Sequence, residues 1–243
     1  MGDEAATDYR AAWQRKPVLR TIYHDYYQRL LAHCRPEGRT LEIGGGSGNL
    51  KTFLPDAIST DIAAAPWLDA VADAQALPFA DNSFANIVMV DVLHHLAYPR
   101  CFLAEAQRVL RPGGRLVMIE PGITPLSHLF YHLLHPEPVR MQAEPLGDQP
   151  QCDPKNPWDS NQAIPTLLFR RDAKRLPAAM PGLRLIRAEW LSLFAYPLSG
   201  GFKPWSLLPA FAAKPLLRLE DGLMPLLGPL MAFRLLAVLE RPA

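Results

Sequence analysis

The chain has 243 residues, of which 49% are hydrophobic, and a formal net charge of +1 at pH 7. This length suits one domain with a full hydrophobic core, and the near-neutral charge argues against a nucleic acid partner. The three cysteines are far apart and fit no metal-ligand spacing, and the acidic N-terminal sequence does not resemble a signal peptide. We therefore expect a cytoplasmic, single-domain protein that does not bind nucleic acid.

Strands and helices are expected to alternate through the first half of the chain. Short apolar runs predict the strands, and apolar residues at helical spacing predict the helices. In chain order, the expected elements are a helix over residues 8–34, a strand over 39–43, the start of a helix over 49–54, strands over 57–61, 70–72 and 84–90, a helix over 100–110, and a strand over 115–119. This alternation is typical of a parallel sheet with helices on both faces.

The second half of the chain differs in character, because the prolines crowd into it. A helix is expected over residues 126–134, and a long polar, proline-rich loop then extends to about residue 166. Two more strands are expected, over 183–193 and in the closing sequence FRLLAVLERP. Between them lies an apolar helical stretch, 203–231, which its prolines are expected to break.

The sequence RTLEIGGGSGNL joins the first expected strand to a loop that contains four glycines. Asn49 stands where a dinucleotide fingerprint has its third glycine, and the lysine of a phosphate-binding loop is absent. Glu42 precedes the loop by two positions, where it would repel a diphosphate and attract a cationic amine. The loop therefore favours a ligand that carries an ammonium group.

Polar residues follow the expected strands at their carboxyl ends, which is where parallel sheets bind ligands. A turn that merely needs glycine would not explain acids at these positions. The residues are the glycine loop, Asp61, Asp73, Asp91 to His95, and Glu120.

Residues 38–122 resemble the class I S-adenosylmethionine-dependent methyltransferases, in the subgroup of the quinone-biosynthesis and sugar O-methyltransferases. The resemblance rests on LEIGGGSGN, on Asp61 19 positions after Glu42, and on ADAQALPFADNSFANIV, VLHHL and VLRPGGRLVMIEPG. It implies an α/β fold with a Rossmann-like, seven-stranded, mostly parallel sheet and helices on both faces. The expected parts of this single domain, 1–243, are N-terminal lid helices over 1–37, a cofactor-binding core over 38–122, a loop-rich acceptor-side insertion over 123–182 after the fifth strand, and C-terminal strands with an apolar helical segment over 183–243.

The resemblance also implies that S-adenosyl-L-methionine is the cofactor. Asp61 would accept both ribose hydroxyls, and Asp73 would accept the adenine amino group beside the Ala74 backbone. Glu42 and Asp91 would face the methionine end. The residues assigned to the cofactor are Glu42, Gly44, Gly45, Gly46, Gly48, Asp61, Ile62, Asp73, Ala74 and Asp91.

Two histidines, His94 and His95, follow the fourth expected strand. A base assists methyl transfer to a hydroxyl, and the resemblance implies that a histidine at this place is often that base. We expect His95 to be the catalytic base. The alternative is that one or both histidines cap the following helix or shape the pocket.

Further acceptor contacts are expected from Tyr23 and Tyr27 on the N-terminal helix, and from His128 and Trp158 in the insertion. Core packing is the alternative for the two tyrosines, and a disordered loop is the alternative for Trp158. His128 shares one helical face with two other histidines, which would suit a metal, but no carboxylate accompanies them and no metal is expected. These two histidines are His132 and His135.

The expected activity is methylation of a small-molecule acceptor, most simply at a hydroxyl, in a biosynthetic pathway. Two alternatives remain open. The apolar segment 203–233 is either buried against the sheet or in contact with a membrane surface, and the second case would suit a lipid-linked sugar or a quinone as acceptor. The other alternative is a non-catalytic regulator that binds the cofactor without turnover.

Overall fold

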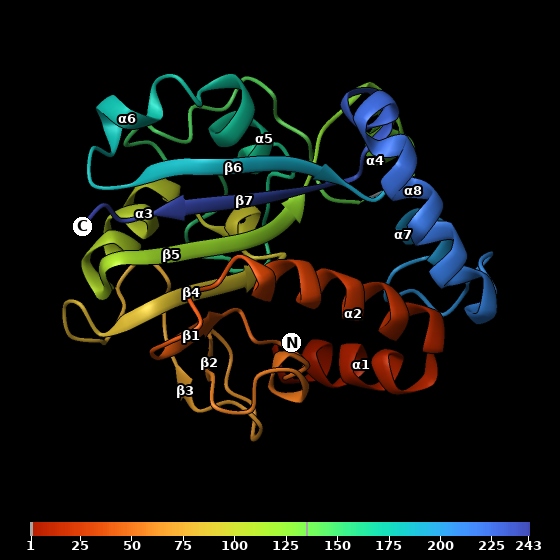
Figure 1. The fold of residues 1–243 in the computed structure, drawn as a ribbon, viewed down its shortest axis with the longest axis horizontal. Helices are drawn as coiled ribbons and strands as arrows, with labels where there is room; N and C mark the ends of the chain where they lie inside the picture. The colour runs from red at the N-terminus through yellow and green to blue at the C-terminus, as the bar shows by residue number, and fades with distance from the viewer. Residues whose placement is uncertain (1, 135) are drawn as a thin grey trace.

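A computed structural model describes residues 2–134 and 136–243 and shows one seven-stranded sheet with the strand order β3-β2-β1-β4-β5-β7-β6 (Figure 1). The first five strands pair in parallel, and β7 is antiparallel to both of its neighbours. This is the expected Rossmann-like, mostly parallel α/β sheet. The strands are β1 (Thr40–Ile43), β2 (Ile58–Asp61), β3 (Ala70–Val71), β4 (Phe84–Val90), β5 (Leu110–Pro121), β6 (Arg184–Leu191) and β7 (Arg234–Glu240).

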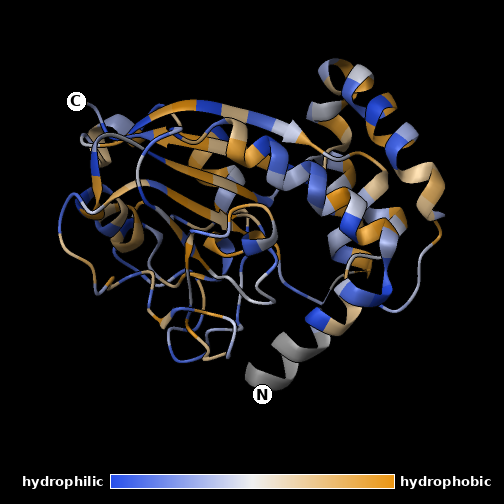
Figure 2. Ribbon diagram, turned by 60° about the horizontal axis from the view of Figure 1, so that its bottom comes forward, coloured by the Kyte–Doolittle hydropathy of each residue, from blue (hydrophilic) through white to orange (hydrophobic). Residues whose placement is uncertain are grey.

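Helices cover both faces of this sheet, so its central strands are apolar on both sides (Figure 2). Successive residues of β5 alternate between two separate cores: Met118 packs with the α3 side chains, and Ile119 packs with those of α2 and α8. The helices are α1 (Gly2–Arg15), α2 (Pro17–Ala32), α3 (Pro99–Val109), α4 (Pro125–Leu134), α5 (Ile164–Thr166), α6 (Leu176–Ala179), α7 (Ala195–Ser199) and α8 (Ala210–Met231).

The expected N-terminal helix is two helices in the structure, because a proline interrupts it. Lys16 adopts an extended conformation between α1 and α2, and Pro17 opens the second helix. A residue that precedes proline is pushed out of the helical region, whereas proline itself is well suited to a first helical turn. The segment that we expect to form the lid therefore contains two helices, and the second of them begins at Pro17.

The prediction of a helix after the glycine loop is wrong, because only one 3₁₀ turn, Leu50–Thr52, forms there. Pro55 follows three residues later and β2 begins at Ile58, so the chain has no room for an α-helix. The opposite error concerns α8, which continues through Pro215, Pro225 and Pro229 as one helix of 22 residues. None of the helices within the described parts of the chain combines the length and the apolar character that crossing a bilayer requires.

Candidate functional site

The glycine loop lies at the carboxyl end of β1 and needs its glycines for two reasons. Gly44 and Gly48 have φ angles of 71° and 74°, in the left-handed region that favours glycine. A Cβ atom on Gly44 would also lie 2.1 Å from Cγ2 of Val92, and one on Gly48 would lie 2.5 Å from Cδ1 of Trp67. The loop is thus packed closely against neighbouring side chains, and no other residue fits at these positions.

Asp61 ends β2 with its carboxylate turned toward this loop. One oxygen accepts the Gly46 N–H at 2.9 Å, and the other accepts the Ala63 N–H at 3.0 Å. A carboxylate has about four lone-pair positions, so both oxygens can still accept ligand hydroxyls. The next side chain, Ile62, is exposed, and it offers an apolar surface beside that carboxylate.

Glu42 is buried beneath the loop, where its carboxyl group accepts a hydrogen bond from the Ser59 hydroxyl. Burial raises the pKa of Glu42 to about 7, although the Ser59 hydrogen bond opposes the shift. A cationic ligand at this end of the loop would favour the carboxylate form. Glu42 is therefore positioned to compensate a positive charge that is bound out of water.

Asp73 follows β3, and its carboxylate accepts a hydrogen bond from the backbone two residues later. Its Oδ1 accepts the Gln75 N–H at 2.8 Å, which orients the loop, and the neighbouring Ala74 is buried. The acids expected after the second and third strands are therefore held by backbone donors at the same edge of the sheet.

Asp91 directly follows β4 in a left-handed conformation, with φ at 60°, and it is the centre of a network that the sequence did not indicate. Its carboxylate forms an ion pair with the guanidinium of Arg234 in β7 and accepts the Tyr23 hydroxyl at 3.2 Å. The Arg234 side chain is buried and also lies over the Tyr196 ring, 4.1 Å from its centroid. Asp91 therefore ties α2, β4 and β7 together beside the glycine loop.

Tyr23 and Tyr27 are buried side chains of α2 that pack with other aromatic rings. The ring centroid of Tyr27 lies 5.0 Å from that of Phe53, and Tyr23 contacts Tyr26 and Tyr196 as well as Asp91. These contacts match the core-packing alternative. An acceptor role for either tyrosine remains a prediction.

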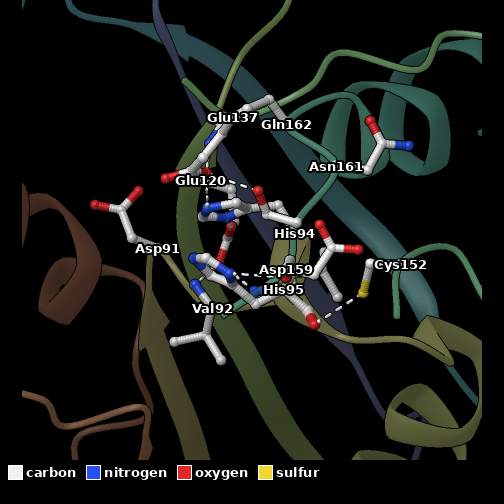
Figure 3. A network of polar contacts seen from close by, with 12 residues as sticks. Asp91, Val92, His94, His95, Glu120, Glu137, Cys152, Asp159, Asn161 and Gln162 are labelled. Carbon is white, nitrogen blue, oxygen red and sulfur yellow. Dashed lines mark hydrogen bonds and ion pairs between the residues drawn. The ribbon is translucent and has the colours of Figure 1, made fainter. Parts of the chain in front are cut away.

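His94 lies three residues after Asp91 and is buried between two glutamates (Figure 3). Its Nδ1 is 2.8 Å from Glu120 Oε2, and its Nε2 is 3.6 Å from Glu137 Oε2. Glu120 in turn accepts the N–H groups of Val92 and Leu93. Burial disfavours a charged imidazole, but the Glu120 carboxylate outweighs it and raises the pKa of His94. Glu120 thus favours the protonated form of His94.

His95 has the opposite electrostatic character, although the two ring centroids are only 4.2 Å apart (Figure 3). Burial and the positive charge of His94 lower the pKa of His95. Its Nδ1 lies 3.1 Å from the backbone oxygen of Asp159. A carbonyl oxygen can only accept, so Nδ1 carries the proton and Nε2 is left as a basic nitrogen. The arrangement therefore holds a neutral imidazole that can take up a proton.

The other expected acceptor residues lie further out. His128 is an exposed residue of α4, whose buried residues are Ser127 and Tyr131, so the expected contact between His128 and an acceptor finds no support in the structure. His132 is exposed too, and His135 is outside the described residues. Trp158 is partly exposed in the long loop, next to the Asp159 whose backbone oxygen holds His95.

The residues around His94 would also be close enough for a metal ion, because one ligand atom from each of His94, His95 and Glu137 lies within 4.8 Å of the others. Glu137 also accepts hydrogen bonds from the Ser160 hydroxyl at 2.8 Å and from the Gln162 amide. These contacts account for the cluster as an ion-paired network without a metal.

Part of the chain is similar to known proteins. Residues 41–118 match a family model described as a methyltransferase domain. The ubiquinone/menaquinone biosynthesis C-methyltransferase UbiE of Dinoroseobacter shibae is 38% identical over 124 residues, which are 42% of this chain and 49% of that protein. The chain thus spans about half the length of the curated relatives that it matches first.

Solved structures agree on the fold over most of the chain. The geranyl diphosphate C-methyltransferase of Streptomyces coelicolor superimposes with a TM-score of 0.53 at 14% identity, over 91% of this chain and 80% of that one. The [4+2]-cyclase SpnF gives the same TM-score at 18% identity, over 90% and 81%. A cyclase and a methyltransferase that fit equally well show that the fold alone does not determine the reaction.

Four features indicate the same kind of protein. They are the glycine loop with its buried acid, the acids at the ends of the next two strands, the strand order and the matched family model. Residues 41–118 are therefore similar to a methyltransferase domain, and the cofactor that this similarity indicates is S-adenosyl-L-methionine.

Proposed function

We propose that the protein methylates a hydroxylated aromatic small molecule of the quinone-precursor kind, at a ring carbon, with His95 as the base. The single observation that carries the proposal is the neutral His95 imidazole just past β4, at the edge of the sheet where the glycine loop follows β1. Its Nδ1–H donates to the Asp159 backbone oxygen and its Nε2 is basic. Ring carbon is preferred over oxygen as the methylated atom because the relative from Dinoroseobacter shibae is named a C-methyltransferase.

The proposed cofactor contacts follow the positions of the acids. The Asp61 carboxylate accepts the ribose hydroxyls, Ile62 lies against the adenine, and Asp73 with Ala74 holds the adenine edge. Glu42 and the Asp91 region face the charged methionine end. Since Glu42 is buried, its carboxylate interacts with the cationic group in a low-dielectric site, where a charge interaction is stronger than in water.

The proposed reaction begins at the acceptor hydroxyl. His95 Nε2 takes the proton of the acceptor hydroxyl, and the oxygen electron pair raises the electron density of the neighbouring ring carbon. That carbon attacks the methyl group in line with the sulfur, and the methyl–sulfur bond breaks to give S-adenosylhomocysteine. The ring carbon then loses its hydrogen as a proton, which restores the aromatic ring. The same base would serve transfer to the oxygen itself, so the product distinguishes the two outcomes.

His94 acts in this scheme as a positioning residue. Glu120 favours its protonated form, and burial together with that charge lowers the pKa of His95, which favours the free base of His95. Alignment of acceptor, methyl and sulfur supplies the rest of the rate, as in other reactions between two bound partners.

The test is a product analysis with S-adenosylmethionine that carries ¹³C in its methyl group and with short-chain hydroxyquinols kept reduced by a thiol. We expect the label on a ring carbon, with one S-adenosylhomocysteine formed per methyl transferred. Label on oxygen would show the O-methylation expected from sequence. Tight cofactor binding without turnover on any hydroxylated ring would refute the proposal and favour a regulator.

A further inference from the structure

The outer side of α8 carries an apolar stripe that no part of the described chain covers. Phe211 is 85% exposed and Leu226 is 74% exposed, and Leu219 and Leu230 lie between and beyond them. With Pro215 and Gly222, these residues recur every three or four positions, which keeps them on one side of the helix. The opposite side packs into the protein through Ala213, Leu217, Glu220 and Gly228.

Two neighbouring segments also expose apolar side chains. Helix α4 packs against α8 and exposes Leu129, Leu133 and Leu134, the second of them at 66%. The loop before α8 exposes Trp205 and Leu207. Apolar patches of this extent are uncommon on soluble monomers and mark interaction sites. The members of this apolar face are Leu129, Leu133, Leu134, Trp205, Leu207, Phe211, Leu219, Leu226 and Leu230.

Two exposed cations of α8 lie beside the apolar stripe. Lys214 and Arg218 are exposed on α8, each three residues after a member of the apolar stripe, and therefore follow its edge. Both acids of α8 are engaged elsewhere. Asp221 is paired with Arg29 at 2.7 Å, and Glu220 is buried and accepts the N–H groups of Phe194 and Ala195. The edge of the face is thus complementary to a negatively charged surface.

The face lies at the functional end of the molecule. The parallel strands point toward α4, α7 and α8, and Asp91, His94 and His95 follow the end of β4 on that side (Figure 1). A surface bound by α8 and α4 would therefore adjoin the end of the sheet that holds the acceptor.

We propose that the apolar face rests on the surface of a bilayer that contains anionic lipids, with Lys214 and Arg218 at the headgroups. The helix lies in the interface, because leucine and phenylalanine side chains on one side and cations at the edge are the pattern of interfacial helices. Each cation near an anionic surface adds to the attraction. Resting on the proposed function, this docking delivers an acceptor dissolved in the lipid phase to the end of the sheet where His95 lies.

The test is co-sedimentation of the full chain with phosphatidylcholine vesicles made with and without phosphatidylglycerol. We expect binding to the anionic vesicles that weakens as salt is added, and little binding to neutral ones. Phe211→Glu with Leu226→Glu should weaken binding by about tenfold or more, since each change replaces apolar contact with a charge of the wrong sign. Lys214→Glu with Arg218→Glu should remove the preference for anionic vesicles.

Val71→Glu is the matched control, because Val71 is also an exposed apolar residue but lies on β3, at the far edge of the sheet. It should bind vesicles as the unmodified chain does, and circular dichroism should show that all variants are folded. Failure of the unmodified chain to bind anionic vesicles at low salt would overturn the proposal. So would a dimer, measured by light scattering, that the Phe211 and Leu226 changes dissociate in place of any vesicle binding. Vesicle binding without methylation of any quinol would refute the proposed acceptor alone.

Discussion

Replacing His95 with alanine is expected to lower kcat by about 10²–10⁴-fold, the usual effect of removing a general base. The affinity for S-adenosylmethionine should change little, because the imidazole faces the acceptor in our proposal. His95→Gln should be equally slow, since an amide can still donate to the Asp159 oxygen but cannot take up a proton. Isothermal titration for the cofactor and steady-state rates for the acceptor measure the two effects separately.

The pH dependence of the same reaction has a defined direction. Burial and the neighbouring His94 charge lower the pKa of His95, while Glu137 and the Asp159 oxygen act against this shift. The free-base form therefore exists above a pKa that lies below the ordinary value for histidine. The rate should rise with pH through that value and be level at neutral pH, and His95→Ala should lose this rise.

His128→Ala is the control, because His128 is an exposed histidine on α4 and should leave kcat unchanged. A metal chelator should also have no effect if His95 acts as a base. A loss of less than tenfold in His95→Ala would mean that alignment alone carries the reaction. Loss of activity on chelation, restored by added metal, would mean that His94, His95 and Glu137 hold an ion.

Replacing Asp91 with alanine should lower the free energy of unfolding by about 3–5 kcal/mol, because it leaves the buried Arg234 guanidinium without its charged partner. Adding Arg234→Met should recover much of this loss, since the double variant buries no charge. Chemical denaturation of the two variants measures the difference.

The exposed ion pair of Arg29 and Asp221 provides the comparison. Asp221 is half exposed, so Asp221→Ala should cost less than about 1 kcal/mol. A similarly small cost for Asp91→Ala would contradict the assignment of Asp91 and Arg234 as a buried structural pair. It would then leave Asp91 with a role in ligand binding only.

Local sequence patterns predicted the sheet well. The strand over 84–90 has the expected bounds, because a run of seven residues, six of them apolar, lies between turn residues and is buried on both faces. Two helix predictions were wrong, and each error has a local cause in the sequence. Pro17 divides the first helix, and Pro55 with the early start of β2 leaves no room for a helix after the glycine loop. The continuity of α8 through three prolines is different, because it depends on packing against α2 and α4.

The site was predictable where its residues follow strands and unpredictable where partners come from distant segments. Asp61 ends β2, and Asp73 and His95 follow β3 and β4, so spacing predicted their places at this edge of the sheet, while their roles remain predictions. Arg234 is 143 positions from Asp91, and no local pattern joins them. The sequence did contain one signal for this ion pair. A single arginine begins an otherwise apolar strand, and a buried charge requires a partner.

The partners of Glu120 and Glu137 also come from distant segments, so the local sequence could not predict them. Glu120 was visible at the end of a strand, but its partner could not be inferred, because His94 meets it only when β4 and β5 pair. Glu137 lies in the insertion, where composition predicts a loop and nothing more.

The most direct test of the account is a crystal structure of the protein with S-adenosylhomocysteine bound. We predict ribose hydroxyls on the Asp61 carboxylate, the adenine against Ile62 beside Asp73, and the sulfur open toward His95 with room for an acceptor ring between them. A nucleoside bound elsewhere, or a sulfur separated from His95 by the Asp91–Arg234 pair, would contradict it.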